Sequence, residues 1–454
     1  MTGKLTLEDL RDAAAVGAID TVIVAVVDMQ GRLMGKRLRA QHFVEEGWKG
    51  AQACLYLLAT DYAMETVPGY RGADWDRGHG DMGLKPDLDT LRRVPWLEAT
   101  ALVLCDAVER ADGRPIPHSP RALLKAQIAR LAAHGLRANA ATELEFHLFA
   151  HGYAAAEAQG HRGLQTLNAR NLDYHILQTS MDEPLLRAIR EGLAGADIPV
   201  EGGRGEASPG QHEINVRHAD ALAMADRHAI IKNAIKEIAH AHGRAATFMA
   251  KWSDAHAGSS AHAHVSLTDA KGRPAFHDAG AEHGMSATMR HFLAGWLANA
   301  DALTLLLAPN VNSYKRFADD SFAPTRAVWS LDNRSAAFRV CGAGGPGVRV
   351  ECRIGGADMN PHVALAALIA AGLDGIERGL SPEPPATGYA YAAGPRSIPR
   401  TLRDAIAALD ASPVFRAAFG DAVVEHYLHA ARWEQAAHDR HVTDWEVRRG
   451  FEQA

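Results

Sequence analysis

The chain has 454 residues, 47% of them hydrophobic, so it can bury a large core. Its formal net charge of −6 gives no basic footprint for nucleic acid, and its apolar runs fall far short of the about 20 residues that span a bilayer. We therefore expect neither a nucleic-acid-binding nor a membrane protein. Four scattered cysteines and a polar start without an apolar leader favour the cytoplasm.

The first part of the chain has the pattern of strands separated by turns. Strand-like runs occur at 21–38 (with a turn at Gln30 and Gly31), 53–59 and 99–106. The first break in composition follows at 108–120, which is rich in proline and charge. We predict a small β-rich N-terminal domain over residues 1–112 and a larger α+β domain over residues 113–454.

Helices with clear start and stop signals follow in the second domain. One begins with Ser119 as N-cap and Pro120 in the first turn, and Gly135 ends it. Further helices are predicted at 220–243 and 360–380, and the tail is helical.

Four strand-like segments carry charged or histidine side chains that can share one face. They are 142–149 with Glu143 and Glu145, 205–216 with Glu206 and Glu213 across a Pro-Gly turn, 259–267 with His262 and His264, and 347–356 with Arg349, Glu351 and Arg353. Residues two apart on a strand lie on one face, with about 6.6 Å between their Cα atoms. If these strands belong to one sheet, five carboxylates and two imidazoles converge.

The charge of such a cluster indicates what it binds. Two carboxylates about 4 Å apart repel by about 1 kcal/mol in water and by about 4 kcal/mol at an effective dielectric constant of 20. Five partly buried carboxylates must therefore be protonated or hold cations. Oxygen ligands with one or two histidines favour Mg²⁺ or Mn²⁺ over zinc. The alternative is that each glutamate is a solvated edge residue and each histidine a core residue, which is harder to accept for four segments together.

Arginines supply the opposite charge. The stretches 312–317, 332–340 and 347–354 together offer Arg316, Arg334, Arg339, Arg349 and Arg353. Arginine binds carboxylate and phosphate with two hydrogen bonds, and metal-holding carboxylates beside arginines suggest phosphoryl transfer from a nucleotide to an anionic acceptor. A surface salt-bridge network is the alternative. The glycine-rich stretch 341–347 lacks the Lys-Ser/Thr of a P-loop, so we interpret it as a connection between strands.

The motifs "TELEF", "PGQHEI", "GSSAHAHVSL", "NSYKR", "DNRSAAFRV" and "RVECR" resemble those of the glutamine synthetase family, in the family's order and over nearly the whole chain. This resemblance implies an α+β fold with an N-terminal β-grasp-like domain and a catalytic domain of antiparallel strands wrapped by helices. It implies a homo-oligomer, usually a dodecamer of two hexameric rings, with active sites between subunits. It also implies that ATP converts the γ-carboxylate of L-glutamate to γ-glutamyl phosphate, which an amine attacks.

Roles for individual residues follow from the same resemblance. Two or three divalent ions are implied, one held by Glu145, Glu206 and Glu213 and another by Glu143, His262 and Glu351. The implied nucleotide contacts are Glu201, His264, Ser266, Arg334, Arg339 and Arg349. The implied glutamate contacts are Gly258, Arg316, Arg334 and Arg353. Arg334, which would touch both glutamate and phosphate, is the predicted catalytic residue.

The sequence departs from the family where the amine binds. Enzymes of the family that use ammonia carry a glutamate six residues after the arginine of "NSYKR", and this chain has Phe322 there. They also carry an aspartate in the N-terminal domain, where Ala51 is nearest by count and Asp61 is a loose candidate. Losing both acids removes the counter-charge and base for ammonium and suits an organic amine. The alternative is a local misalignment, with Asp319 or Asp320 supplying the acid.

We therefore predict a ligase, dependent on ATP and Mg²⁺ or Mn²⁺, that joins L-glutamate to a primary amine other than ammonia. The wording of several motifs is similar to the branch of γ-glutamylpolyamine and γ-glutamylethanolamide synthetases. An ethanolamine-like monoamine is favoured over a polyamine, because a polycation needs several carboxylates, although Asp74, Asp76 and Asp81 could line an entrance. An ammonia-using glutamine synthetase and a non-catalytic protein on the same fold are the alternatives.

Overall fold

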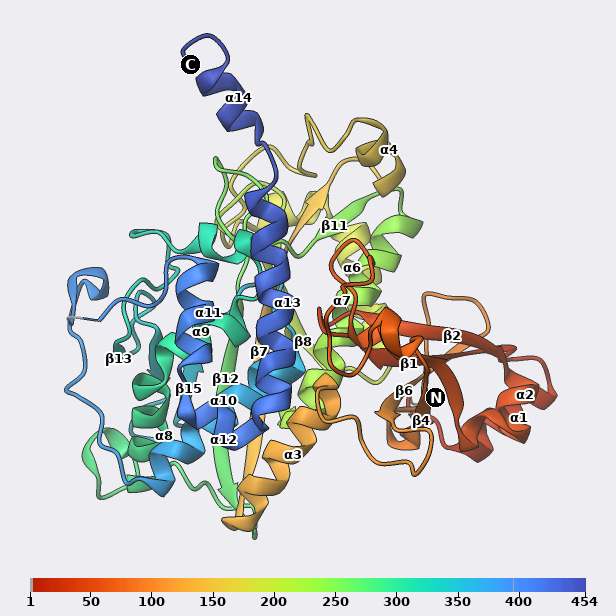
Figure 1. The fold of residues 1–454 in the computed structure, drawn as a ribbon, viewed down its shortest axis with the longest axis horizontal. Coiled ribbons are helices and arrows are strands. Elements are labelled where there is room, and N and C mark those ends of the chain that lie inside the picture. The colour runs from red at the N-terminus through yellow and green to blue at the C-terminus, as the bar shows by residue number, and fades with distance from the viewer. Residues whose placement is uncertain (1–2, 395) are drawn as a thin grey trace.

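The computed structural model describes residues 3–394 and 396–454, and its strands form two separate sheets. The N-terminal sheet, in red and orange, lies beside a larger body built around the second sheet (Figure 1). The long helix α13 (Asp421–Asp439) runs along that body, and the C-terminal helix α14 (Asp444–Gly450) projects from it. The α+β fold class predicted from the sequence is confirmed.

The N-terminal sheet has the strand order β2-β1-β6-β4-β3, with β5 paired to β6. Its strands are β1 (Thr21–Val27), β2 (Leu33–Arg39), β3 (Ala51–Cys54), β4 (Asp81–Pro86), β5 (Arg92–Arg93) and β6 (Thr100–Val108), and the helices α1 (Leu7–Ala15) and α2 (Ala40–Glu45) accompany it. β1 and β6 are parallel, and the other pairs are antiparallel. The turn between β1 and β2 contains Gly31 at a φ of 78°, which favours glycine.

One strand prediction in this sheet is wrong in its extent. The run 53–59 is a strand only to Cys54, where β3 ends, and Leu55–Leu58 form a 3₁₀ helix. In a short apolar run, periodicity does not distinguish a strand from a turn of helix. Here the packing of the buried Leu58 favours the helical turn.

The second sheet has the order β13-β14-β15-β12-β7-β9-β8, with β10 and β11 paired to β7. Its strands are β7 (Leu136–Phe149), β8 (Val200–Gly205), β9 (Gln211–Val216), β10 (Ala219–Asp220), β11 (Ala245–Thr247), β12 (Ala261–Asp269), β13 (Trp329–Leu331), β14 (Phe338–Cys341) and β15 (Arg349–Cys352). All pairs are antiparallel except β13 with β14. The stretch 341–347 connects β14 to β15, as predicted.

Helices pack around this second sheet. They are α3 (Pro120–Ala133), α4 (Tyr153–Ala158), α5 (Ile176–Met181), α6 (Glu183–Gly195), α7 (Ala221–Ala241), α8 (Ala287–Ala298), α9 (Ala300–Leu307), α10 (Pro361–Glu377), α11 (Leu402–Asp410) and α12 (Pro413–Phe419), together with α13 and α14. The three helices predicted in this part of the sequence correspond to α3, α7 and α10. Nearly every residue of α10 is buried, which explains its lack of a polar face.

The two sheets are joined by contacts of the C-terminal helices with the N-terminal part. Asn360, the N-cap of α10, donates to the carbonyl oxygens of Asp28 and Met29. His426 of α13 is hydrogen-bonded to the carbonyl oxygen of Leu58 at 2.8 Å. The predicted domain boundary at residue 112 falls between β6 and α3, and we keep it as a proposal.

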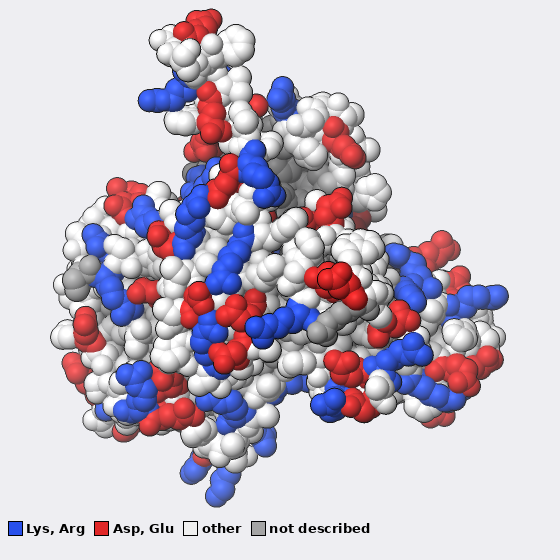
Figure 2. Space-filling view, viewed as in Figure 1, with Lys and Arg blue, Asp and Glu red and all other residues white. Residues whose placement is uncertain are grey.

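The surface carries both signs of charge. On the face shown in Figure 2, Lys and Arg side chains are interspersed with Asp and Glu. Across the described residues, each helix is too short or too polar to cross a membrane.

Candidate active site

The register of the second sheet places the four charged segments next to one another. Opposite partners in neighbouring strands are Glu143 and His262, Glu145 and Glu213, His264 and Glu351, and Arg339 and Glu351. The sheet therefore brings together side chains that are more than 200 positions apart in the sequence, as the alternating pattern predicted.

The first carboxylate cluster consists of Glu145, Glu206 and Glu213, three buried residues with oxygens within 4.8 Å of one another. Burial raises the pKa of Glu145 to about 7, with the charge of Glu213 adding to the effect. Burial and the charges of Glu145 and Glu213 raise the pKa of Glu206 to about 9. Arg204 is the guanidinium bonded to this cluster: it pairs with Glu206 and lies 3.3 Å from Glu213. The cluster thus has more negative charge than its surroundings neutralise.

The second cluster consists of Glu143, His262 and Glu351, again with ligand atoms within 4.8 Å of one another. Burial would raise the pKa of Glu351, but neighbouring positive groups, including Arg353, lower it to about 2. Burial and the charge of Arg353 lower the pKa of His262 to about 4, so His262 is neutral at pH 7 and the guanidinium is the charge that acts on Glu351 there. Arg339 also donates to Glu351, at 3.0 Å.

Both donor sets fit a hard divalent cation. Three carboxylates, or two carboxylates with one neutral imidazole, are the ligands that Mg²⁺ and Mn²⁺ accept in proteins. The raised pKa values of Glu145 and Glu206 are what burial of an uncompensated anionic site produces. The structure brings together each of the two predicted ligand sets, and the assignment of ions to them remains a proposal.

The predicted glutamate contacts lie beside these clusters. Arg316 and Arg353 are both buried, and the Arg316 guanidinium donates to the Ser260 hydroxyl at 3.1 Å and to the carbonyl oxygen of Arg353 at 3.3 Å. Arg353 donates to Glu351. At Gly258 a Cβ atom would lie 2.5 Å from Cγ of Arg316, so only glycine fits against that arginine.

A cleft of about 1050 Å³, including space open to solvent, adjoins the second cluster. Its lining includes Glu143 of that cluster and four predicted nucleotide contacts, Glu201, His264, Ser266 and Arg349. The described residues that line this cleft do not include the other two predicted nucleotide contacts, Arg334 and Arg339.

Those two arginines lie on and before β14. Arg339 bonds to Asp332 and Glu351. Arg334 is exposed, and its charge lowers the pKa of Asp332, after the larger effect of the hydrogen bond and charge from Arg339. The structure therefore places Arg334 near the site but shows no contact of its guanidinium with the clusters.

The loop that contains Phe322 lies against the glutamate arginines. Phe322 has 62% of its surface exposed and a φ of 59°, and its carbonyl oxygen accepts a hydrogen bond from Arg353 at 3.5 Å. The two acids of this loop have partners elsewhere: Asp319 accepts from the Thr325 hydroxyl at 2.8 Å, and Asp320 accepts from the Tyr389 hydroxyl at 2.9 Å.

The candidates for the second missing acid lie in the N-terminal part. Ala51 begins β3. Asp61 accepts from the backbone N–H groups of Ala63 and Glu65 and from the indole N–H of Trp433 on α13. These bonds tie Asp61 to its own turn and to α13 within this chain.

Three residues that support the clusters were not selected from the sequence. The Gln211 side chain donates to Glu145 at 3.1 Å and to the carbonyl oxygen of Gly258 at 3.0 Å, and the Ser260 N–H donates to Glu145 at 2.7 Å. Arg204 lies two positions before Glu206 at the end of β8, so the same alternation could have indicated it. Gln211 lies in the motif "PGQHEI" and Ser260 in "GSSAHAHVSL". Both side chains are neutral, so a search for charged or histidine residues does not find them.

Comparison with known proteins identifies the family. The family model "Glutamine synthetase, catalytic domain" matches residues 117–450. The chain belongs to the glutamine synthetase family. It is 48% identical over 452 residues to the gamma-glutamylethanolamide synthetase GlnA4 of Streptomyces coelicolor, covering 99% of this chain and 96% of the relative.

Further relatives include enzymes named for organic amines and for glutamine. A glutamate–isopropylamine ligase of a Pseudomonas species is 37% identical over 450 residues, covering 98% of each chain. A glutamine synthetase of Thermus thermophilus is also 37% identical, over 387 residues, covering 81% of this chain and 84% of the relative. Among solved structures, GmaS without ligand has a TM-score of 0.85 at 28% identity, covering 98% of this chain and 99% of the other. Two of the relatives that align over nearly the full chain are glutamate–amine ligases by name.

Proposed function

We propose that this chain is an ATP-dependent ligase that joins the γ-carboxylate of L-glutamate to a small primary amine other than ammonia, through γ-glutamyl phosphate. An ethanolamine-like monoamine is the favoured acceptor and a polyamine the next. The observation that carries the proposal is Phe322, at the position where the resemblance to the family implies a glutamate in ammonia-using enzymes. Asp319 and Asp320, the acids that could replace it, are bonded to Thr325 and Tyr389. The similarity to the ethanolamide synthetase supports the same choice.

The two carboxylate clusters would hold the metal ions, and the cleft beside the second cluster would hold the nucleotide. Bound divalent ions, two or three of Mg²⁺ or Mn²⁺, would neutralise the phosphates of ATP. Glu145, Glu206 and Glu213 would hold one ion, and Glu143, His262 and Glu351 another. The nucleotide would lie in the cleft lined by Glu201, His264, Ser266 and Arg349. Arg339, which is bonded to Glu351 of the second cluster, would contact the nucleotide from outside that lining.

The arginines would orient the two anionic substrates. Buried Arg316 and Arg353 are fixed by hydrogen bonds, so little side-chain freedom is lost when they bind a carboxylate of glutamate. Exposed Arg334 would contact both the glutamate γ-carboxylate and the transferring phosphate, where it would stabilise the developing charge. Gly258, which packs against Arg316, would contact the amino acid through its backbone.

We infer the size and charge of the acceptor from Phe322 and from the acids of the N-terminal part. An apolar ring favours an amine with a short carbon chain over bare ammonium. Two of the three acids considered as an entrance for a polycation are engaged in the N-terminal part: Asp74 accepts from the N–H of Gly69 at 2.7 Å, and Asp81 lies 3.9 Å from Arg110. A monoamine therefore fits better than a polyamine.

Two broader properties belong to the same proposal. A dodecamer of two hexameric rings is the assembly implied by the resemblance to the family. A cytoplasmic location agrees with four free cysteines, Cys54, Cys105, Cys341 and Cys352, since thiols persist in a reducing compartment.

The test is phosphate release with ATP and L-glutamate across a panel of ammonium, ethanolamine, isopropylamine and putrescine. We expect the highest kcat/KM with ethanolamine and at least ten-fold less with ammonium. Glu213→Gln serves as the control for contaminating activity and should release no phosphate. Ammonium matching the best organic amine would make the chain a glutamine synthetase, and unchanged nucleotide binding and activity in Glu351→Ala would favour a non-catalytic protein.

A further inference from the structure

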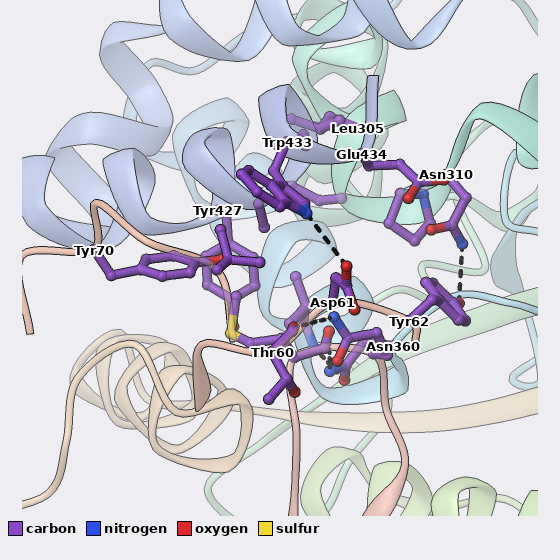
Figure 3. Close-up of a pocket in the computed structure, with 18 residues that line it drawn as sticks. Thr60, Asp61, Tyr62, Tyr70, Leu305, Asn310, Asn360, Tyr427, Trp433 and Glu434 are labelled. Atoms are coloured by element: carbon purple, nitrogen blue, oxygen red, sulfur yellow. Dashed lines mark hydrogen bonds between the residues drawn. The ribbon is translucent and has the colours of Figure 1, made fainter. Parts of the chain in front are cut away.

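A second cavity lies between the N-terminal part of the chain and α13. Its volume is about 70 Å³, which by this measure gives room for about five water-sized groups. Figure 3 shows Trp433 and Glu434 of α13 on one side and Thr60, Asp61 and Tyr62 on the other. None of the residues that form the two carboxylate clusters lines it. Apolar side chains supply much of the wall: Met29, Val67, Leu305, Leu306, Val363 and Ala431.

Two carboxylates face this largely apolar space. Burial raises the pKa of Glu434, and the charge of Asp61 raises it further, so the two groups are close enough to repel. Neither forms a salt bridge among the described residues. A nearby cation, Arg32, is held by the Asp28 carboxylate at 2.7 Å and by the main-chain oxygens of Asp61 and Tyr62. The cavity therefore keeps an excess of negative charge.

Aromatic rings complete the lining. Tyr62, Tyr70, Tyr427 and Trp433 all border the cavity, and the Trp433 indole donates to Asp61 at 3.2 Å. Aromatic faces attract organic cations, with estimates of about 0.5–2 kcal/mol per ring. Thr60 also lines the space: it is 2% exposed, and its hydroxyl has no hydrogen-bond partner among the described residues.

We propose that this cavity is a second binding site for a small organic ammonium ion, with Asp61 and Glu434 supplying the opposite charge, one of them accepting an N–H of the ion, and the aromatic rings contacting its alkyl groups. An ammonium with two or three carbon atoms matches the volume. A bare metal cation fits less well, because Na⁺ and K⁺ require a shell of oxygen ligands and most of this wall is carbon.

The cavity is connected to the predicted glutamate site by one short element. Asn310 lines the cavity, and its side chain donates to the Tyr62 hydroxyl at 3.0 Å and to Asp358 at 2.9 Å. Asn310 caps the 3₁₀ helix Val311–Arg316, and Glu434 accepts the N–H of Val311. Arg316, the last residue of that helix, is a proposed glutamate contact. A cation that attracts Glu434 would therefore alter the position of this helix and the apparent affinity for glutamate, a consequence that rests on the proposed function.

The probe is trimethylammonium chloride, a tertiary amine that cannot form an amide and is not turned over. Isothermal titration of the full chain should show saturable binding, which weakens at least ten-fold in the double variant Asp61→Asn with Glu434→Gln. Both substitutions keep an oxygen that accepts the N–H groups of Ala63, Glu65 and Val311. Ala430→Leu, which fills part of the cavity and leaves both acids in place, should weaken binding similarly. Asp421→Asn, at the exposed start of α13, should leave it unchanged.

The outcomes separate this site from the active site. Binding that persists in both cavity variants would place the probe elsewhere and overturn the proposal, as would an equal response to KCl. With the preferred amine as acceptor, trimethylammonium should change the KM for glutamate at least two-fold in the wild type and not in the double variant. An unchanged KM in the wild type would overturn the coupling. Probe binding in a chain that turns over no amine would contradict only the proposed function. Amine turnover without probe binding would contradict only the proposal of a second site.

Discussion

The two carboxylate clusters contain similar ligands in opposite electrostatic settings. In the cluster of Glu145, Glu206 and Glu213, three carboxylates lie together. Arg204 is bonded to Glu206 and Glu213, and the charges of Arg316 and Arg353 act on Glu145 without outweighing the effect of its burial. In the cluster of Glu143, His262 and Glu351, the buried Glu351 already bonds to Arg339 and Arg353. The first cluster is therefore built to attract a cation, whereas the second is nearly neutral before any ion arrives. Ligand identity alone does not show how a metal site behaves.

The largest expected effect comes from removing Glu351, the buried acid of the nearly neutral cluster of Glu143, His262 and Glu351. Glu351→Ala should reduce kcat/KM at least a thousand-fold and lower the free energy of unfolding by about 3–5 kcal/mol, because the buried Arg353 and the half-buried Arg339 lose this carboxylate partner. Phosphate release and urea denaturation measure the two effects. An unfolding free energy equal to that of the wild type would show that Glu351 does not hold Arg339 and Arg353 in place.

The matching change in the acidic cluster should have the opposite effect on stability. Glu206→Gln should lower kcat/KM at least a hundred-fold by weakening a metal ligand, yet raise the unfolding free energy of the metal-free protein at pH 7 by about 1 kcal/mol, because a neutral amide is buried there without the proton uptake that Glu206 requires. Urea denaturation of both variants in EDTA, which removes divalent ions, allows their unfolding free energies to be compared directly. If both variants are destabilised alike, the contrast between the clusters is wrong.

Metal binding should release protons from the acidic cluster. The pKa values of about 7 for Glu145 and about 9 for Glu206 lie above the usual range, so both groups hold protons at neutral pH that a divalent ion must displace. Apparent Mg²⁺ affinity should therefore rise with pH and level off above about 9. Titrations in buffers of different ionisation enthalpy count the protons, and Glu206→Gln should release fewer of them. Proton-free binding at pH 7 would contradict the electrostatic description.

The same pKa values determine how stability changes with pH. The folded-state pKa of each acid is above its unfolded value of 4.5, so protonated Glu145 and Glu206 contribute stability that is fully present below pH 4.5 and is lost as the pH rises to about 7 for Glu145 and to about 9 for Glu206. Without metal, the melting temperature should fall across this window. With saturating Mg²⁺ the fall should be smaller, because the ion supplies the missing positive charge.

The smallest change concerns the loop beside the neutral cluster. Phe322→Glu places an acid in the loop whose backbone contacts Arg353 and should raise kcat/KM for ammonium relative to ethanolamine by about ten-fold, since a carboxylate binds ammonium and accepts its proton. Phe322→Leu is the matched control, which keeps the loop apolar and should retain the preference for the organic amine. An unaltered ratio in Phe322→Glu would show that this position does not select the acceptor.

The sequence by itself determined the residues of both clusters. Side chains on a strand repeat every two residues, so the spacing of Glu143 with Glu145 and of His262 with His264, together with Glu351, is sufficient to predict one charged face. Motif spacing indicated the family, capping signals located α3 and α10, and α7 was predicted as a helix over 220–243. These features are local, because backbone geometry and neighbouring side chains specify them.

Only the tertiary structure decided which charges neutralise one another. The register of β14 with β15 gave Glu351 its arginine partners and left Glu206 with an excess of acid. Packing also turned Leu55–Leu58 into a 3₁₀ helix and placed Asp61 beside Trp433, 372 positions away, to form the second cavity. Such pairings depend on contacts between distant segments, whose electrostatic energy depends on burial and distance rather than on residue type.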